Sequence, residues 1–164
     1  MRIVASLVGL ALSAASAVAA DLNVPVNELH TRLNSFTRAN KIDLRASRLG
    51  CDTGVKTVCQ YKISTAVGIL TSSDAPGGMA KEVTVLYGSD KPADALQGLL
   101  AYTAVIAVLS PYAKPEQRGD LIMSLFRGIE DSGDKESAEL GSVKYTMMSV
   151  KGLGLWFIAA PVDP

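Results

Sequence analysis

The apolar positions of the chain change their period several times, and each period predicts a type of element. Between residues 25 and 40, apolar side chains recur every three or four positions, which predicts a helix with one buried stripe: Val26, Leu29, Leu33 and Phe36. From 42 to 47, apolar and polar residues alternate, as expected for a strand that buries one face. Further strands are predicted at 55–63, 67–72 and 82–87, with turn sequences between them.

The segment from Pro92 to Leu109 is apolar around its whole circumference, which predicts a helix at the centre of a core. It is also too short, and too interrupted by polar residues, to predict a membrane span. Another helix is predicted to begin at Pro115, because proline is favoured in the first turn, where its missing N–H breaks no hydrogen bond. We expect this helix to end before Gly133, and the charged stretch 131–139 to be a loop.

The end of the chain predicts a hairpin, with strands at 143–150 and 155–160 joined by a glycine-containing turn. Strands joined by tight turns pair antiparallel, and helices that follow each other in sequence usually cover one face of a sheet. The sequence therefore predicts an α+β fold. We expect an antiparallel sheet of five to six strands with three helices, in the order α-β-β-β-β-α-α-β-β.

The first twenty residues have the three-part pattern of a secretory signal peptide. Arg2 precedes an apolar run over residues 3–12, and small residues follow up to Ala20. The alternative is an uncleaved membrane anchor, but a span needs about 20 apolar residues and this run is shorter. We therefore expect residues 1–20 to be a cleaved signal peptide and residues 21–164 to form one domain. The protein is then a bacterial periplasmic or secreted protein with no stable membrane insertion after cleavage.

Export changes the interpretation of the two cysteines. Cys51 and Cys59 flank a turn sequence between two predicted strands, and cysteine pairs in oxidising compartments are usually bridged. We expect a structural disulfide across this hairpin. A redox-active pair is the alternative, but such pairs are usually spaced Cys-x-x-Cys at the start of a helix.

The charge and composition exclude some partners and cofactors. The chain has 16 basic and 16 acidic residues, and this balance argues against nucleic-acid binding, which depends on clustered cations. One histidine and two cysteines are too few for a standard structural zinc site. We therefore expect no metal, no cofactor and no nucleic acid.

Three short motifs match parts of catalytic patterns. Asp52-Thr53-Gly54 resembles the tripeptide of aspartic proteases, but those proteins are nearly all β, and the same tripeptide is common in turns. His30 lies beside a predicted helix stripe, and no nucleophile motif accompanies it. Ser132 and Lys135 match Ser-x-x-Lys in a polar segment. None of these forms a catalytic constellation, and we assign no catalytic residue.

The last hairpin is apolar on both of its expected faces, which is unusual for a strand with one side in water. One explanation is a central strand covered on both sides by its own chain. The other is an exposed apolar surface, which usually marks a binding site, and the candidate residues are Tyr145, Met147, Trp156 and Ile158.

Two hypotheses about function follow. The first is an exported, non-catalytic domain that binds a protein partner, a second copy of itself or a small apolar ligand through an apolar sheet face. The second is an enzyme of hydrolase type, whose site leaves no motif in the sequence.

Overall fold

The computed structural model describes residues 20–89 and 91–162 of the chain, so the predicted signal peptide lies almost entirely outside the described residues. The described residues form seven strands and three helices. These are α1 Leu29–Ala39, β1 Ser47–Thr53, β2 Thr57–Lys62, β3 Val67–Ser73, β4 Glu82–Tyr87, α2 Pro92–Leu109, α3 Pro115–Ser132, β5 Lys135–Leu140, β6 Val143–Val150 and β7 Gly154–Pro161.

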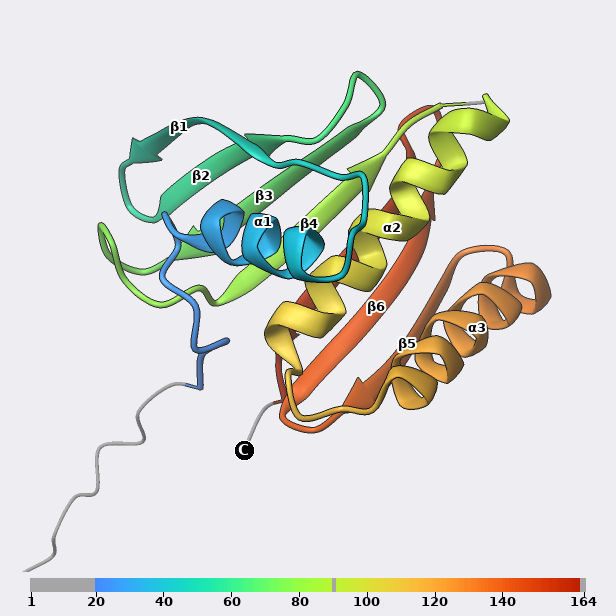
Figure 1. Ribbon diagram of the computed structural model, residues 1–164. Helices are drawn as coiled ribbons and strands as arrows, with labels where there is room; N and C mark the ends of the chain where they lie inside the picture. Colours follow the sequence, from blue (N-terminus) through green and yellow to red (C-terminus); the bar gives the residue numbers. More distant parts are fainter. Residues whose placement is uncertain (1–19, 90, 163–164) are drawn as a thin grey trace, which may run out of the picture.

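The strands make one antiparallel sheet in the order β1-β2-β3-β4-β7-β6-β5, and all three helices lie on one face of it (Figure 1). The predicted α+β class, the antiparallel sheet and the three helices are confirmed. The predicted number of strands was too low, because the sheet has seven rather than five or six. The last strand, β7, lies in the middle of the sheet, where it joins the β1–β4 meander to the β5–β6 hairpin.

The core lies between the sheet and the helices, with α2 across the middle of the sheet (Figure 1). Side chains from α2 such as Val105 and Ile106 are fully buried there. From the sheet, Tyr145 and Phe157 stack with ring centroids 5.6 Å apart, and Tyr102 of α2 packs on Phe157 at 4.9 Å. The all-round apolar pattern of α2 thus marks a central helix, as the sequence predicts.

The alternating segment at residues 42–47 is not a strand for most of its length, and this prediction was wrong. Leu44 and Ala46 are buried, but against α1 rather than in the sheet. The side-chain amide of Asn34 donates to the carbonyl of Ala46 at 2.9 Å and accepts from its N–H at 2.8 Å. The residues from 42 to 46 thus alternate in burial although they pair with no neighbouring strand, and β1 begins only at Ser47.

The first helix is also shorter than the predicted range 25–40. The residues before α1 run extended beside the segment that precedes β4, where Leu22 N–H donates to the Ala80 carbonyl and Val26 N–H to that of Gly78. The carbonyl of Val26 in turn accepts from the buried hydroxyls of Tyr61 and Thr71. Val26, the first residue of the predicted stripe, thus lies in the turn before α1 and not in the helix.

The charged stretch 131–139 holds the strand that the sequence analysis missed. Residues from Lys135 onward form β5, which pairs with β6 at the edge of the sheet and is covered by α3. Only Ala138 and Leu140 pack against the core, and both stay partly exposed, so β5 has no strong apolar alternation. The side chain of Glu136 lies directly over Gly128 of α3, so that a Cβ atom on Gly128 would overlap the Cγ atom of Glu136.

This close approach predicts opposite effects for two glycines of the same helix. Gly119→Ala should stabilise the protein by up to about 1 kcal/mol, because its Cβ would meet nothing within 4 Å and alanine favours a helix. Gly128→Ala should destabilise it by about 1–2 kcal/mol, because the Glu136 side chain must leave its place over α3. Urea unfolding monitored by circular dichroism measures both values. Equal stabilisation by the two substitutions would show that β5 does not pack on α3 in this way.

Candidate functional site

The disulfide predicted between Cys51 and Cys59 is present. The two residues lie directly opposite each other in β1 and β2, with Cα atoms 4.0 Å apart. Every residue of β1 is exposed, whereas Cys59 is fully buried. The bridge therefore attaches an edge strand that buries no side chain of its own to the core. We interpret it as structural.

The four residues predicted as an interaction surface do not share one face of the sheet. Tyr145 and Met147 lie opposite Ala159 and Phe157 on the face that the helices cover, and both are fully buried. These two belong to the core, and placing them on an exposed surface was wrong. Trp156 and Ile158 point to the other face and remain partly exposed. Because side chains alternate along a strand and Met147 pairs with Phe157, the neighbouring Trp156 and Ile158 point to the opposite face.

The face without helices, which we call the open face, carries apolar side chains from four neighbouring strands. In the register, Trp156 lies between Leu86 and Met148, and Ile158 lies between Thr84 and Thr146. The open face also includes neighbours on both sides of these positions, and its central residues are Leu70, Thr84, Leu86, Thr146, Met148, Trp156, Ile158 and Ala160. The sequence analysis missed Leu70, Leu86 and Met148, although they alternate with the buried positions of their strands.

The residues of the open face form three rows that cross the strands. From β2 to β5 the first row runs Lys62, Gly68, Leu86, Trp156, Met148, Lys135, so that a lysine stands at each end of these six strands, and Ser47 of the edge strand β1 follows beyond Lys62. The middle row runs Gln60, Leu70, Thr84, Ile158, Thr146, Ser137 and contains no charge. The third row runs Val58, Ser72, Glu82 on one side and Ala160, Lys144, Glu139 on the other. The open face thus has an apolar centre with charges toward its edges.

The apolar centre is tightly packed within its own chain. Thr84 is only 5% exposed, although no helix of the described residues covers it, because Leu70 and Ile158 flank it in the middle row. Its hydroxyl donates to Glu82 Oε1 at 2.9 Å and therefore needs no water. The hydroxyls of Ser137 and Thr146 bond to each other at 2.9 Å in the same way. Because these hydroxyl groups already have hydrogen-bond partners within the chain, little free energy is lost when water is removed from this part of the surface.

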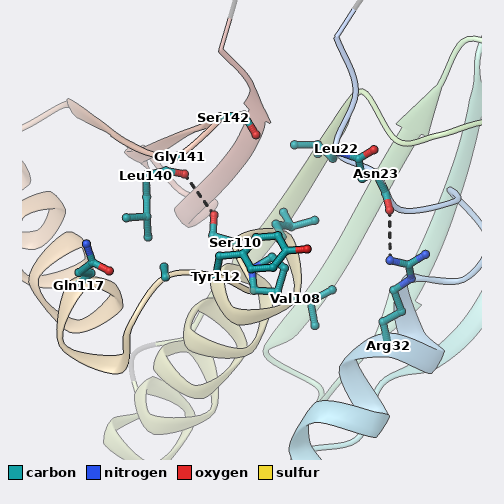
Figure 2. A pocket seen from close by; sticks show the side chains of 13 residues that line it. Leu22, Asn23, Arg32, Val108, Ser110, Tyr112, Gln117, Leu140, Gly141 and Ser142 are labelled. Atoms are coloured by element: carbon teal, nitrogen blue, oxygen red, sulfur yellow. Dashed lines mark hydrogen bonds between the residues drawn. The ribbon is translucent and has the colours of Figure 1, made fainter.

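A separate pocket of about 480 Å³ opens on the other side of the sheet (Figure 2). It lies between the end of α2, the start of α3, the β5–β6 turn and the segment before α1. Apolar side chains line much of it, and the polar residues that face it include Arg32, Ser110, Tyr112 and Gln117. A pocket of this size is within the range of small-molecule sites.

The polar groups of the pocket already bond within the chain. Arg32 donates to the carbonyl of Asn23 at 3.1 Å, and the amide oxygen of Gln117 accepts from the N–H of Lys114 at 2.9 Å. The Ser110 hydroxyl bonds to the carbonyl of Leu140 at 3.2 Å and to the Tyr145 hydroxyl at 2.7 Å (Figure 2 shows the contact to Leu140). The pocket therefore has no cluster of polar groups that all point toward one ligand atom.

The Ser110–Tyr145 pair is also poorly suited to nucleophilic catalysis. Burial raises the pKa of Tyr145 to about 12, although the Ser110 hydrogen bond and the charge of Arg118 both lower it. A tyrosine that holds its proton at neutral pH cannot remove one from Ser110. The pair is better explained as a buried hydrogen bond that joins the end of α2 to β6.

The short motifs considered in the sequence lie apart from the pocket. His30 stacks on Tyr61 with ring centroids 5.5 Å apart, and its buried Nδ1 has no hydrogen-bond partner among the described residues. Asp52 lies on the exposed edge strand β1, opposite Val58. The hydroxyl of Ser132 donates to the carbonyl of Lys135 at 3.4 Å, which is a contact within the turn after α3. In the described ranges, no three His, Cys, Asp or Glu residues are grouped so that they could hold a metal ion.

Comparisons with known proteins give no match: no family model, no curated protein and no solved structure resembles the chain closely enough to be matched. Within the described part of the chain, no helix is long and apolar enough to cross a membrane. The disulfide is compatible with an extracytoplasmic location. The site must therefore be interpreted from its own geometry.

Proposed function

We propose that the protein is an exported, non-catalytic domain that binds a protein partner through the open face of its sheet. One observation carries this proposal. In the part of the chain that the structure describes, a seven-stranded antiparallel sheet has helices on one face only, and the other face presents Leu70, Leu86, Met148, Trp156 and Ile158 side by side. Contiguous apolar surface of this kind usually marks a protein interface.

The composition of the open face supports a protein partner. Tryptophan and methionine are among the residues enriched at the centres of interfaces, and charges are depleted there. Trp156 occupies the centre, whereas Lys62 and Lys135 stand at the edges of the same row. Since the open face is part of a sheet, it presents a broad surface rather than an enclosed cavity. The pocket near Ser110 supports a ligand-binding role less well, because Arg32, Ser110 and Gln117 already have partners within the chain.

Trp156→Ala should weaken binding at least about tenfold, because the indole is the largest side chain at the centre of the face. The melting temperature should change by only a few degrees, since Trp156 lies outside the core between sheet and helices. The control is Leu96→Ala, which removes an apolar side chain that is even more exposed, from α2 on the helix side. Co-purification from the native host measures binding, and calorimetry measures folding.

The position of the contact can be tested directly with a photoreactive amino acid. Placed at residue 156, it should form adducts in the native host, whereas at Tyr112, which is exposed beside the pocket, it should not. Adducts from position 112 alone would contradict the proposal and favour the pocket side. Loss of the cooperative unfolding transition in Trp156→Ala would also contradict it, because Trp156 would then be a core residue.

A further inference from the structure

We propose that the partner of the open face is a second copy of the same chain, packed about a two-fold axis that runs along the middle row, across the strands. This inference rests on the proposed function, since it names the occupant of the same surface. It is carried by the pattern of charge and side-chain size in the three rows. In a dimer with two-fold symmetry, the direction of the axis decides whether a row of one copy faces the same row or a different row of the second copy.

Two arrangements keep the strands of the two sheets aligned, as in most sheet-on-sheet packing. If the axis ran parallel to the strands, the first row would face itself, and Lys62 at one edge would meet Lys135 at the other. Both ends of that row would then bring two lysines together, which opposes association. If the axis runs across the strands, the first row faces the third row of the second copy. No two like charges then face each other: Lys135 meets Glu139, and Leu86 meets the aliphatic stem of Glu82, whose carboxylate accepts from the Thr84 hydroxyl.

The second arrangement brings a lysine to a glutamate on β5. Lys135 and Glu139 lie on the same strand, one in the first row and one in the third, at equal distances from the middle row. The two-fold axis therefore places Lys135 of each copy opposite Glu139 of the other, twice in the dimer. Both side chains are exposed and long enough to meet at the small angle between aligned sheets. Their charges complement each other only with this axis.

Side-chain size is complementary in the same arrangement. Trp156 lies opposite Ala160 of the second copy, so that the largest side chain of the face meets one of the smallest. Met148 lies opposite Lys144, whose aliphatic stem can cover it while the ammonium group stays in water. Ile158 of the uncharged middle row packs against its own copy at the axis. An interface of large residues against small ones fits together as sheets do in a β-sandwich.

The size of the surface indicates a dimer of modest affinity. Six strands spaced about 4.8 Å apart and three rows about 7 Å apart give a contact area at the lower end of the usual range for specific interfaces. We therefore expect monomer and dimer to exchange at micromolar concentrations.

Charge reversal tests the axis. In sedimentation equilibrium, Lys135→Glu alone and Glu139→Lys alone should each raise the dimer dissociation constant about tenfold, because each places like charges together twice. The double variant Lys135→Glu/Glu139→Lys should return to within about threefold of the original value, since the reversed pair again attracts. As a control, Lys41→Glu, exposed after α1, should leave dimerisation unchanged. A double variant as weak as the singles overturns this axis.

The mass of the adduct from residue 156 separates this inference from the proposed function. An adduct of twice the chain mass, together with a weaker dimer for Trp156→Ala in sedimentation equilibrium, supports the two-copy interface. An adduct with a different protein, together with a purified protein that stays monomeric up to millimolar concentration, overturns the second copy but leaves the proposed function standing. A monomer that gives no adduct from residue 156 overturns both.

Discussion

Ile106→Asp should abolish folding. Ile106 lies in the last turn of α2 and is fully buried in the core between the helices and the sheet. The substitution places a carboxyl group in an apolar site without a partner, which costs several kcal/mol and is a large part of the total stability of a domain. We expect no cooperative unfolding transition in circular dichroism, together with the random-coil signal of an unfolded chain.

A matched control lies on the same helix. Leu96→Asp makes the same type of change, but Leu96 is 57% exposed, so the carboxylate stays in water. This variant should unfold within about 1 kcal/mol of the original protein. If the two variants were equally stable, α2 would not present the Ile106 side to the core, and the packing of the whole helix layer would be wrong.

Raising the pH above 10 should destabilise the protein steeply. Tyr61, Tyr102 and Tyr145 are buried, and burial is the main cause that raises the pKa of each hydroxyl above its ordinary value. For Tyr102 the nearby Tyr87 raises the pKa further, whereas hydrogen bonds to Thr71 and Ser110 oppose the rise for Tyr61 and Tyr145.

The direction of the effect follows from proton binding. In the unfolded chain a tyrosine loses its proton near pH 10, whereas in the folded protein the same hydroxyl keeps it. Above pH 10 the folded state therefore binds more protons, and the free energy of unfolding falls as the pH rises. Each buried tyrosine contributes about 1.4 kcal/mol per pH unit until its folded pKa is reached, which for Tyr145 is about 12.

Urea unfolding between pH 9 and 11.5 measures this slope, and Tyr145→Phe is the informative variant. At pH 8 it should be less stable by about 1 kcal/mol, because Ser110 loses a hydrogen-bond partner. Above pH 10 its free energy of unfolding should fall less steeply than that of the original protein. The same slope in both proteins would show that Tyr145 ionises as readily when folded as when unfolded.

The two faces of the sheet explain why only two of the four candidate surface residues, Trp156 and Ile158, lie on the open face. On β7 and β6 the apolar run continues on both faces, so composition could not distinguish the buried Tyr145 and Met147 from the open Trp156 and Ile158. The distinction depends on which side the helices cover. That choice is made by long-range packing of α2 on the sheet, and no local pattern in the hairpin records it.

The sequence by itself determined the elements that have strong local signals. Pro92, Pro115 and Gly133 mark the ends of α2 and α3, and Gly133 takes the left-handed backbone, with φ 81°, that a helix end favours. The α+β class and the cysteine pairing also followed from local pattern and spacing. In each case neighbouring residues alone supply the physical constraint.

Only the tertiary structure decided how the strands are ordered and which surface is free. The edge strands β1 and β5 bury too little to show an apolar period, so one was displaced in the sequence prediction and the other was missed. The insertion of β7 between β4 and β6 depends on backbone hydrogen bonds between residues about 70 positions apart. Backbone hydrogen bonds involve no particular side chains, so the sequence pattern does not show that these strands are neighbours. The residues of the open face are therefore brought together only when the chain is folded.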